Sequence, residues 1–131
     1  MSTRGYVGRL NEDGSVDAIY NHFDSYFDGL GKDLLKDFNT KEKVDELIAR
    51  GDGSYVSNAT PYEDATPHHF ASKEEYLDAL DNDVFIEYIY LFVEGMWYAK
   101  NHLCGKRYVS SDAKGFYWDL TLLSEILNPE S

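Results

Sequence analysis

The 131-residue sequence contains one cysteine, three prolines and no long uninterrupted apolar run. A lone Cys104 cannot form an intrachain disulfide, and free cysteine is typical of a reducing compartment. A membrane-spanning helix needs ~18 or more consecutive, largely uncharged apolar residues, and no segment provides them. The first five residues also lack the apolar region of a secretory signal. We therefore expect a cytoplasmic protein that makes no contact with a membrane.

Basic residues are scarce as well: 12 Lys and Arg stand against 24 Asp and Glu, a formal net charge of −12. The imbalance is uneven, because residues 51–99 hold ten acidic residues and one lysine (net −9), whereas the rest of the chain carries −3. Such a field repels nucleic acids and anionic membranes and attracts basic protein surfaces. An acidic surface also keeps a protein soluble without any partner, so charge alone leaves both interpretations open.

The length and the apolar pattern predict a single domain spanning residues 1–131. Strand-like runs at 6–10 and 15–20 flank an Asp-Gly turn, which predicts a β-hairpin. A second hairpin is predicted where the apolar run 84–93 turns at Glu94-Gly95 into 96–99. Because few polar residues interrupt this run, we expect it to be a central strand covered on both faces.

Helical spacing of apolar residues predicts four helices. The first covers residues 30–38, and the second starts at Asn39 as N-cap and stops at Gly51. The third begins at Ser72, and a short one ends the chain at 120–127. Further short strands are expected at 54–56 and 106–109. The fold class is therefore α+β: a small antiparallel sheet built from hairpins, with three to four helices packed on one side of it.

Two stretches carry recognisable motifs. The first contains Ser2-Thr3-Arg4, Asn11-Glu12-Asp13-Gly14-Ser15-Val16, Ile19-Tyr20, His22 and Asp24, and the second is Tyr90-Leu91-Phe92-Val93-Glu94-Gly95-Met96-Trp97-Tyr98. Both resemble a family of small, largely uncharacterised phage and prophage accessory proteins. That family has Trp, Gly and Pro where this chain has Phe23, Ser25 and Phe27. The resemblance implies a phage-type origin and an accessory role in the cytoplasm of a host cell, and it brings no chemistry with it.

Candidate metal ligands are few and scattered: His22, His68, His69, His102 and Cys104. His102 and Cys104 lie two residues apart, but no second pair has the spacing of a zinc site. We predict no metal and no cofactor, and whether the five residues converge in space is left to the structure.

Catalytic motifs are absent too: the sequence has no glycine-rich phosphate loop and no Gly-x-Ser-x-Gly elbow. We predict a non-enzymatic protein with no catalytic residues. An enzyme with His22 as a base oriented by Asp24 is the third interpretation.

The acidic segment is the strongest positive signal. Duplex DNA carries one negative charge per ~1.7 Å of its axis, and an array of carboxylates can imitate it. We predict an inhibitor that occupies the nucleic-acid site of a basic host protein, a defence nuclease of a CRISPR or restriction system. The residues predicted to bind this partner are Glu63, Asp64, Glu74, Glu75, Asp78, Asp81 and Asp83.

A second interpretation starts from the 11 tyrosines. Aromatic side chains commonly line ligand pockets, so the chain could instead sequester a small molecule. The candidate pocket residues are Tyr55, Tyr62, Tyr88, Tyr90 and Trp97. The oligomeric state is open, because the run 84–93 would form a homodimer interface if one of its faces were uncovered.

Overall fold

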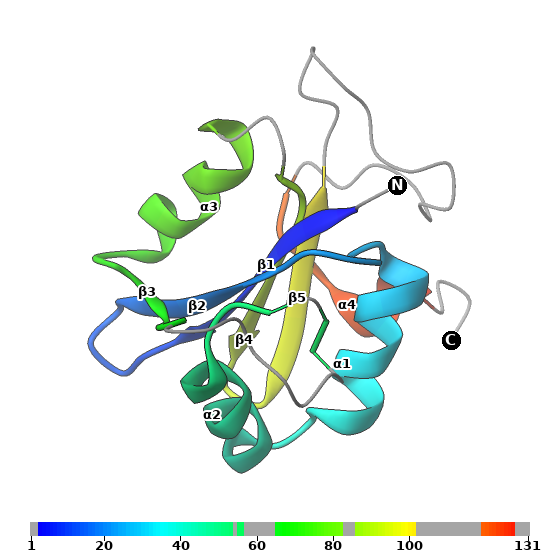
Figure 1. The fold of residues 1–131 in the computed structure, drawn as a ribbon, viewed down its shortest axis with the longest axis horizontal. Coiled ribbons are helices and arrows are strands. Elements are labelled where there is room, and N and C mark those ends of the chain that lie inside the picture. The colour runs from blue at the N-terminus through cyan, green and yellow to red at the C-terminus, as the bar shows by residue number, and fades with distance from the viewer. Residues whose placement is uncertain (1–2, 54, 57–64, 83–85, 102–118, 128–131) are drawn as a thin grey trace.

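The computed structural model describes residues 3–53, 55–56, 65–82, 86–101 and 119–127 (Figure 1). Within these residues, six strands form one sheet in the order β3-β2-β1-β4-β5-β6. The strands are β1 Arg4–Leu10, β2 Val16–Asn21, β3 His68–Phe70, β4 Ile86–Val93, β5 Met96–Asn101 and β6 Thr121–Leu122. The helices are the π-helical turn η1 Phe27–Gly31, α1 Lys32–Asp37, α2 Lys41–Arg50, α3 Lys73–Asn82 and α4 Leu123–Leu127. The predicted α+β class is confirmed.

Both predicted hairpins are present. Strands β1 and β2 pair antiparallel from Gly5↔Asn21 to Leu10↔Val16, and Gly14 in their turn has a φ of +90°. Strands β4 and β5 pair antiparallel across a turn in which Glu94 and Gly95 have φ values of +48° and +86°. Two successive residues with positive φ give a turn whose twist matches that of the flanking strands, which is why glycine is favoured there.

The centre of the sheet departs from a purely antiparallel arrangement, because β1 and β4 run parallel. A parallel neighbour needs a long connection, and residues 11–85 supply it with α1, α2 and α3. The β1–β4 register shifts between Arg4↔Ile86 and Gly5↔Tyr88, so Glu87 is the extra residue of a bulge. This bulge changes which face the following residues of β4 occupy.

Helices cover both faces of the sheet, so the prediction that they lie on one side is wrong. On one face, Tyr88, Tyr90 and Phe92 of β4 pack in a core with η1, α1, α2 and α4. On the other face, Ile89 and Leu91 of β4 pack in a second core with α3. Figure 1 shows α3 separated from α1, α2 and α4 by the sheet. The predicted central strand is confirmed, since β4 is buried along nearly its whole length.

Helix α2 starts one residue later than predicted. Thr40 is the N-cap and its Oγ1 accepts a hydrogen bond from the Lys43 amide at 3.3 Å, while Asn39 is exposed. The N-cap is the residue with an extended backbone directly before the first helical residue, because its side chain reaches the free amides of the first turn. Here that residue is Thr40 and not Asn39. The predicted stop is confirmed, because Gly51 follows the helix with a φ of +82°.

The region after α2 differs from the prediction. Residues 55–56 are not in a strand; instead, Gly53 forms an isolated bridge with Asn21, and the unpredicted strand β3 pairs with β2. The predicted strand at 106–109 lies outside the described residues. At the end of the chain, residues 121–122 form β6 and only 123–127 are helical. Among the described helices, none has the length and apolarity needed to cross a membrane.

Candidate protein-binding surface on helix α3

Local hydrogen bonds define the start of α3. The Glu75 amide donates to Ser72 Oγ at 3.1 Å, so Ser72 caps the helix and the predicted start is confirmed. The Glu75 carboxylate accepts from the Ala71 amide at 3.1 Å. Glu75 therefore has a structural role at the helix start, although its side chain is exposed.

The inner face of α3 is fixed to the sheet by Tyr76 and Leu80, whose exposed fractions are 0% and 1%. The Tyr76 hydroxyl donates a hydrogen bond to the carbonyl oxygen of Tyr90 in β4 at 2.6 Å. Burial raises the pKa of this hydroxyl well above its ordinary value of 10.0, so it remains a donor at physiological pH. A buried aromatic anchor with a directed hydrogen bond holds the helix in one orientation.

The outer face of α3 carries the predicted acidic residues. Glu74, Glu75 and Asp78 are exposed. Glu74 and Asp78 form no ion pair within the part of the chain that the structure describes. At ~100° per residue, positions 74, 78 and 81 fall within about 60° of one another around the helix. Residue 81 lies in α3, and its side chain is outside the described part.

The other predicted binding residues remain predictions. Glu63, Asp64 and Asp83 lie outside the described residues. The structure therefore places Glu74, Glu75 and Asp78 together on one rigid helix.

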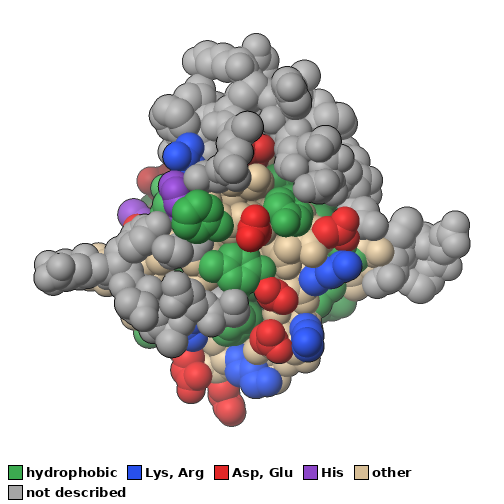
Figure 2. Space-filling view, turned by 45° about the vertical axis from the view of Figure 1, so that its right-hand side comes forward, with side chains coloured by type: hydrophobic (Ala, Val, Ile, Leu, Met, Phe, Trp, Pro, Cys, Tyr) green, Lys and Arg blue, Asp and Glu red, His purple; other side chains and the backbone are tan. Residues whose placement is uncertain are grey.

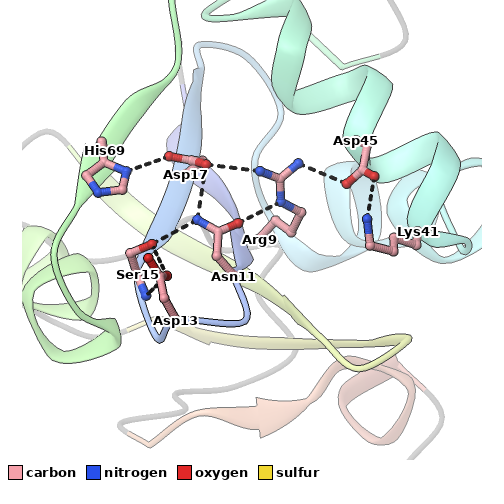
Figure 3. Close-up of polar contacts among 8 residues, drawn as sticks. All are labelled: Arg9, Asn11, Asp13, Ser15, Asp17, Lys41, Asp45 and His69. Carbon is pink, nitrogen blue, oxygen red and sulfur yellow. Dashed lines mark hydrogen bonds and ion pairs between the residues drawn. The ribbon is translucent and has the colours of Figure 1, made fainter.

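Elsewhere in the domain, several carboxylates are engaged with basic or polar side chains. Figure 3 shows the largest such network, in which the Arg9 guanidinium bridges Asp17 of β2 at 3.0 Å and Asp45 of α2 at 2.9 Å. Asp17 also contacts His69 Nδ1 at 2.7 Å, and Asp45 contacts Lys41 Nζ at 2.7 Å. The network ties the first hairpin to β3 on one side and to α2 on the other.

Contacts among the residues drawn in Figure 3 lower the pKa of three carboxyl groups, those of Asp13, Asp17 and Asp45, below the ordinary value of 3.8. Hydrogen bonds from Ser15 are the largest cause for Asp13, the hydrogen bond with His69 for Asp17, and the hydrogen bond from Lys41 for Asp45. Each partner favours the ionised carboxylate, so these three carboxyl groups are ionised at neutral pH.

Helices α2 and α3 differ sharply in charge, although each has ten residues. The segment of α2 holds three acidic and three basic residues, whereas that of α3 holds four acidic residues and Lys73. Figure 2, which brings the α1 side of the molecule forward, shows acidic and basic side chains interleaved around hydrophobic ones. The outer face of α3 is thus acidic, unlike α2 or the face in Figure 2.

The histidines have separate partners. His68 Nε2 contacts Asp52 at 2.8 Å, His69 contacts Asp17, and His22 Nδ1 lies 2.7 Å from the Tyr20 hydroxyl. Within residues 3–53, 55–56, 65–82, 86–101 and 119–127, no three His, Cys, Asp or Glu residues are grouped as a metal site would require. His102 and Cys104 lie outside the described residues.

His22 and Asp24 do not form the pair that an oriented base requires. No hydrogen bond joins their side chains, although both are described. Asp24 adopts a φ of +56°, and its carbonyl oxygen accepts from the Leu30 amide at 2.9 Å. This geometry gives Asp24 a role in closing the loop before η1.

The aromatic residues proposed to line a pocket lie mostly in the core. Tyr88 and Tyr90 are fully buried, Trp97 is 2% exposed, and Tyr62 is outside the described residues. Tyr55 lines a cavity of only about 10 Å³ and donates a hydrogen bond to Asp33. Since β4 is covered on both faces within one chain, the condition for a dimer through residues 84–93 is not met over its described part.

A ligand-sized cavity of about 450 Å³ occurs at a different place, between the β1–β2 turn, the β4–β5 turn and the start of α2. Its lining includes Leu10, Phe92 and Val93 together with charged side chains. Sequence reasoning missed it because the lining comes from three segments far apart in the chain. No local pattern signals such a site.

No family model, curated protein or solved structure matches this chain. Function therefore has to be inferred from the residues and their arrangement.

Proposed function

We propose that the outer face of α3 binds a basic protein surface. The observation that carries this proposal is the charge balance of the helix: α3 holds four acidic residues and one lysine, and Glu74 and Asp78 form no ion pair with any described residue. Helix α2 also exposes Glu42 and Glu46, but its three acidic residues are balanced by three basic ones. Like charges at i and i+4 destabilise a helix by ~0.2–0.5 kcal/mol per pair. An external basic surface would relieve this repulsion and gain charge-assisted contacts.

The spacing of the charges suits a surface that binds nucleic acid. With a helical rise of ~1.5 Å per residue, the four acidic positions 74, 75, 78 and 81 average one per ~3.5 Å of helix axis. Phosphates of one DNA strand recur every ~3.4 Å of duplex axis. Together with the resemblance to phage accessory proteins, this spacing leads us to propose as partner a nucleic-acid-handling host protein, such as a defence nuclease.

Two variants of matched design test the proposal. One removes the exposed i, i+4 carboxylates of α3 (Glu74→Gln/Asp78→Asn), and the other removes those of α2 (Glu42→Gln/Glu46→Gln). Both reduce the net charge equally, so they separate a local site from a general effect of charge. Each tagged protein is incubated with a bacterial host lysate and washed with increasing salt.

We expect the wild type and the α2 variant to retain the same basic protein, and the α3 variant to lose it. Duplex DNA should displace the captured protein, and binding should weaken with salt because screening shortens from ~30 Å at 0.01 M to ~10 Å at 0.1 M. The proposal is wrong if the α3 variant captures the partner as well as the wild type does. Equal loss by both variants would show that only net charge matters.

A further inference from the structure

The 450 Å³ cavity between the two hairpin turns is independent of α3. Its volume falls within the ~300–1,000 Å³ that is usual for small-molecule sites. Its apolar lining comes from Leu10, Phe92 and Val93. Phe92 is only 4% exposed and its ring centroid lies 5.1 Å from that of Trp97.

The apolar part of this cavity is rigidly supported. The Trp97 indole donates a hydrogen bond to the Phe38 carbonyl oxygen at 2.7 Å, which fixes the ring that backs Phe92. The turns that carry the remaining lining are held by the antiparallel pairs Leu10↔Val16 and Val93↔Met96. A preformed apolar surface does not have to be ordered when a ligand binds.

Four charged side chains line the cavity, and they are not equivalent. Arg9 and Lys41 are neutralised by Asp17 and Asp45, through contacts of 2.7–3.0 Å. Glu12 and Glu94 are exposed and make no ion pair with any described residue. The excess charge around the cavity is therefore negative.

We propose that this cavity binds a small organic cation with an apolar body, of the arylalkylammonium class. The apolar body would pack against Leu10, Phe92 and Val93, and the ammonium group would be attracted by Glu12 and Glu94. The site differs from the tyrosine-lined pocket that the composition suggested, and it does not depend on the proposed binding of a basic protein.

Three probes of similar shape test the charge and the apolar contact separately: 2-phenylethylammonium, the neutral 2-phenylethanol and the anionic phenylacetate. Each is titrated into the ¹⁵N-labelled full chain, and amide shifts are followed by NMR. We expect saturable shifts with 2-phenylethylammonium at residues 10–14 and 92–95, weaker binding of the alcohol, and the weakest binding of phenylacetate. Tighter binding of phenylacetate, or shifts only outside these segments, would overturn the proposal.

The carboxylates are then tested in the variant Glu12→Gln/Glu94→Gln. Its affinity for the ammonium probe should fall by about threefold to tenfold, as expected for two partly solvated charge contacts. Its affinity for the alcohol should not change. The variant Glu42→Gln/Glu46→Gln is the control, because it removes the same charge from residues that do not line the cavity. An equal loss of affinity in both variants would contradict a specific role of Glu12 and Glu94.

Discussion

The ring of Tyr76 on α3 packs directly against Gly8 on β1. A Cβ atom placed on Gly8 would lie 2.7 Å from Cζ and 2.9 Å from the hydroxyl oxygen of Tyr76. The same hydroxyl donates to the Tyr90 carbonyl oxygen on the neighbouring strand. Because Gly8 has no side chain, α3 can lie close to β1. This contact sets the position of the acidic outer face of α3.

We predict that Gly8→Ala destabilises the protein by about 1–3 kcal/mol, the usual cost of adding a methyl group to a packed core. Urea denaturation followed by circular dichroism measures the change. In the double variant Gly8→Ala/Tyr76→Leu, the smaller side chain relieves the clash, so its destabilisation should be less than the sum of the single effects. Strict additivity would show that the two residues do not interact.

The exposed carboxylates of Glu74 and Asp78 should contribute nothing to folding. We expect Glu74→Gln/Asp78→Asn to leave the free energy of unfolding within about 0.5 kcal/mol of the wild type, or to raise it slightly by removing repulsion. In contrast, Ser72→Ala should lower it by about 1 kcal/mol, because the Glu75 amide loses its acceptor. A large destabilisation of the double variant would assign these residues a structural role instead.

Two adjacent residues, Asn39 and Thr40, are expected to differ in their contribution to stability, because only Thr40 caps α2. We predict that Thr40→Ala lowers the free energy of unfolding by about 0.5–2 kcal/mol, since Thr40 Oγ1 accepts from the Lys43 amide. The matched variant Asn39→Ala should have almost no effect, because Asn39 is exposed and outside the cap. Thermal unfolding of both variants decides the question, and a larger effect at Asn39 would favour the cap expected from sequence.

The Asp17 network predicts a dependence of stability on acid pH. The hydrogen bond with His69 is the largest cause that lowers the pKa of Asp17 below 3.8 in the folded protein. Its stabilisation is therefore present above pH 3.8 and is lost as the pH falls through the lower folded value. We expect Asp17→Asn to lower stability at pH 7 by about 1–3 kcal/mol, as for a lost charged hydrogen bond.

Below pH 3 the difference between Asp17→Asn and the wild type should shrink, because Asp17 is then protonated in both the folded and the unfolded chain. Urea denaturation at pH 7, 4 and 2.5 measures this convergence. A constant difference across the range would mean that the effect of the substitution is not electrostatic.

Local sequence patterns were sufficient to predict the two hairpins. Their turns need residues that tolerate positive φ, and a strand-like run flanks each turn on both sides. The helix starting at Ser72 was equally readable, since its cap and its apolar spacing lie within a few residues. The short strand β3 was not predicted, because it is stabilised by pairing with β2, some fifty residues earlier in the chain. Its two exposed histidines carry no β signal of their own.

Composition and the helical repeat alone predict the α+β class, the strongly acidic segment and the exposure of Glu74, Glu75 and Asp78. Tertiary contacts determine that β1 and β4 pair in parallel, that α3 is the one helix of the described residues on its face of the sheet, and which carboxylates form ion pairs. It also created the cavity between the two hairpin turns. Each of these features depends on which distant residues meet, and local propensity carries no information about such contacts.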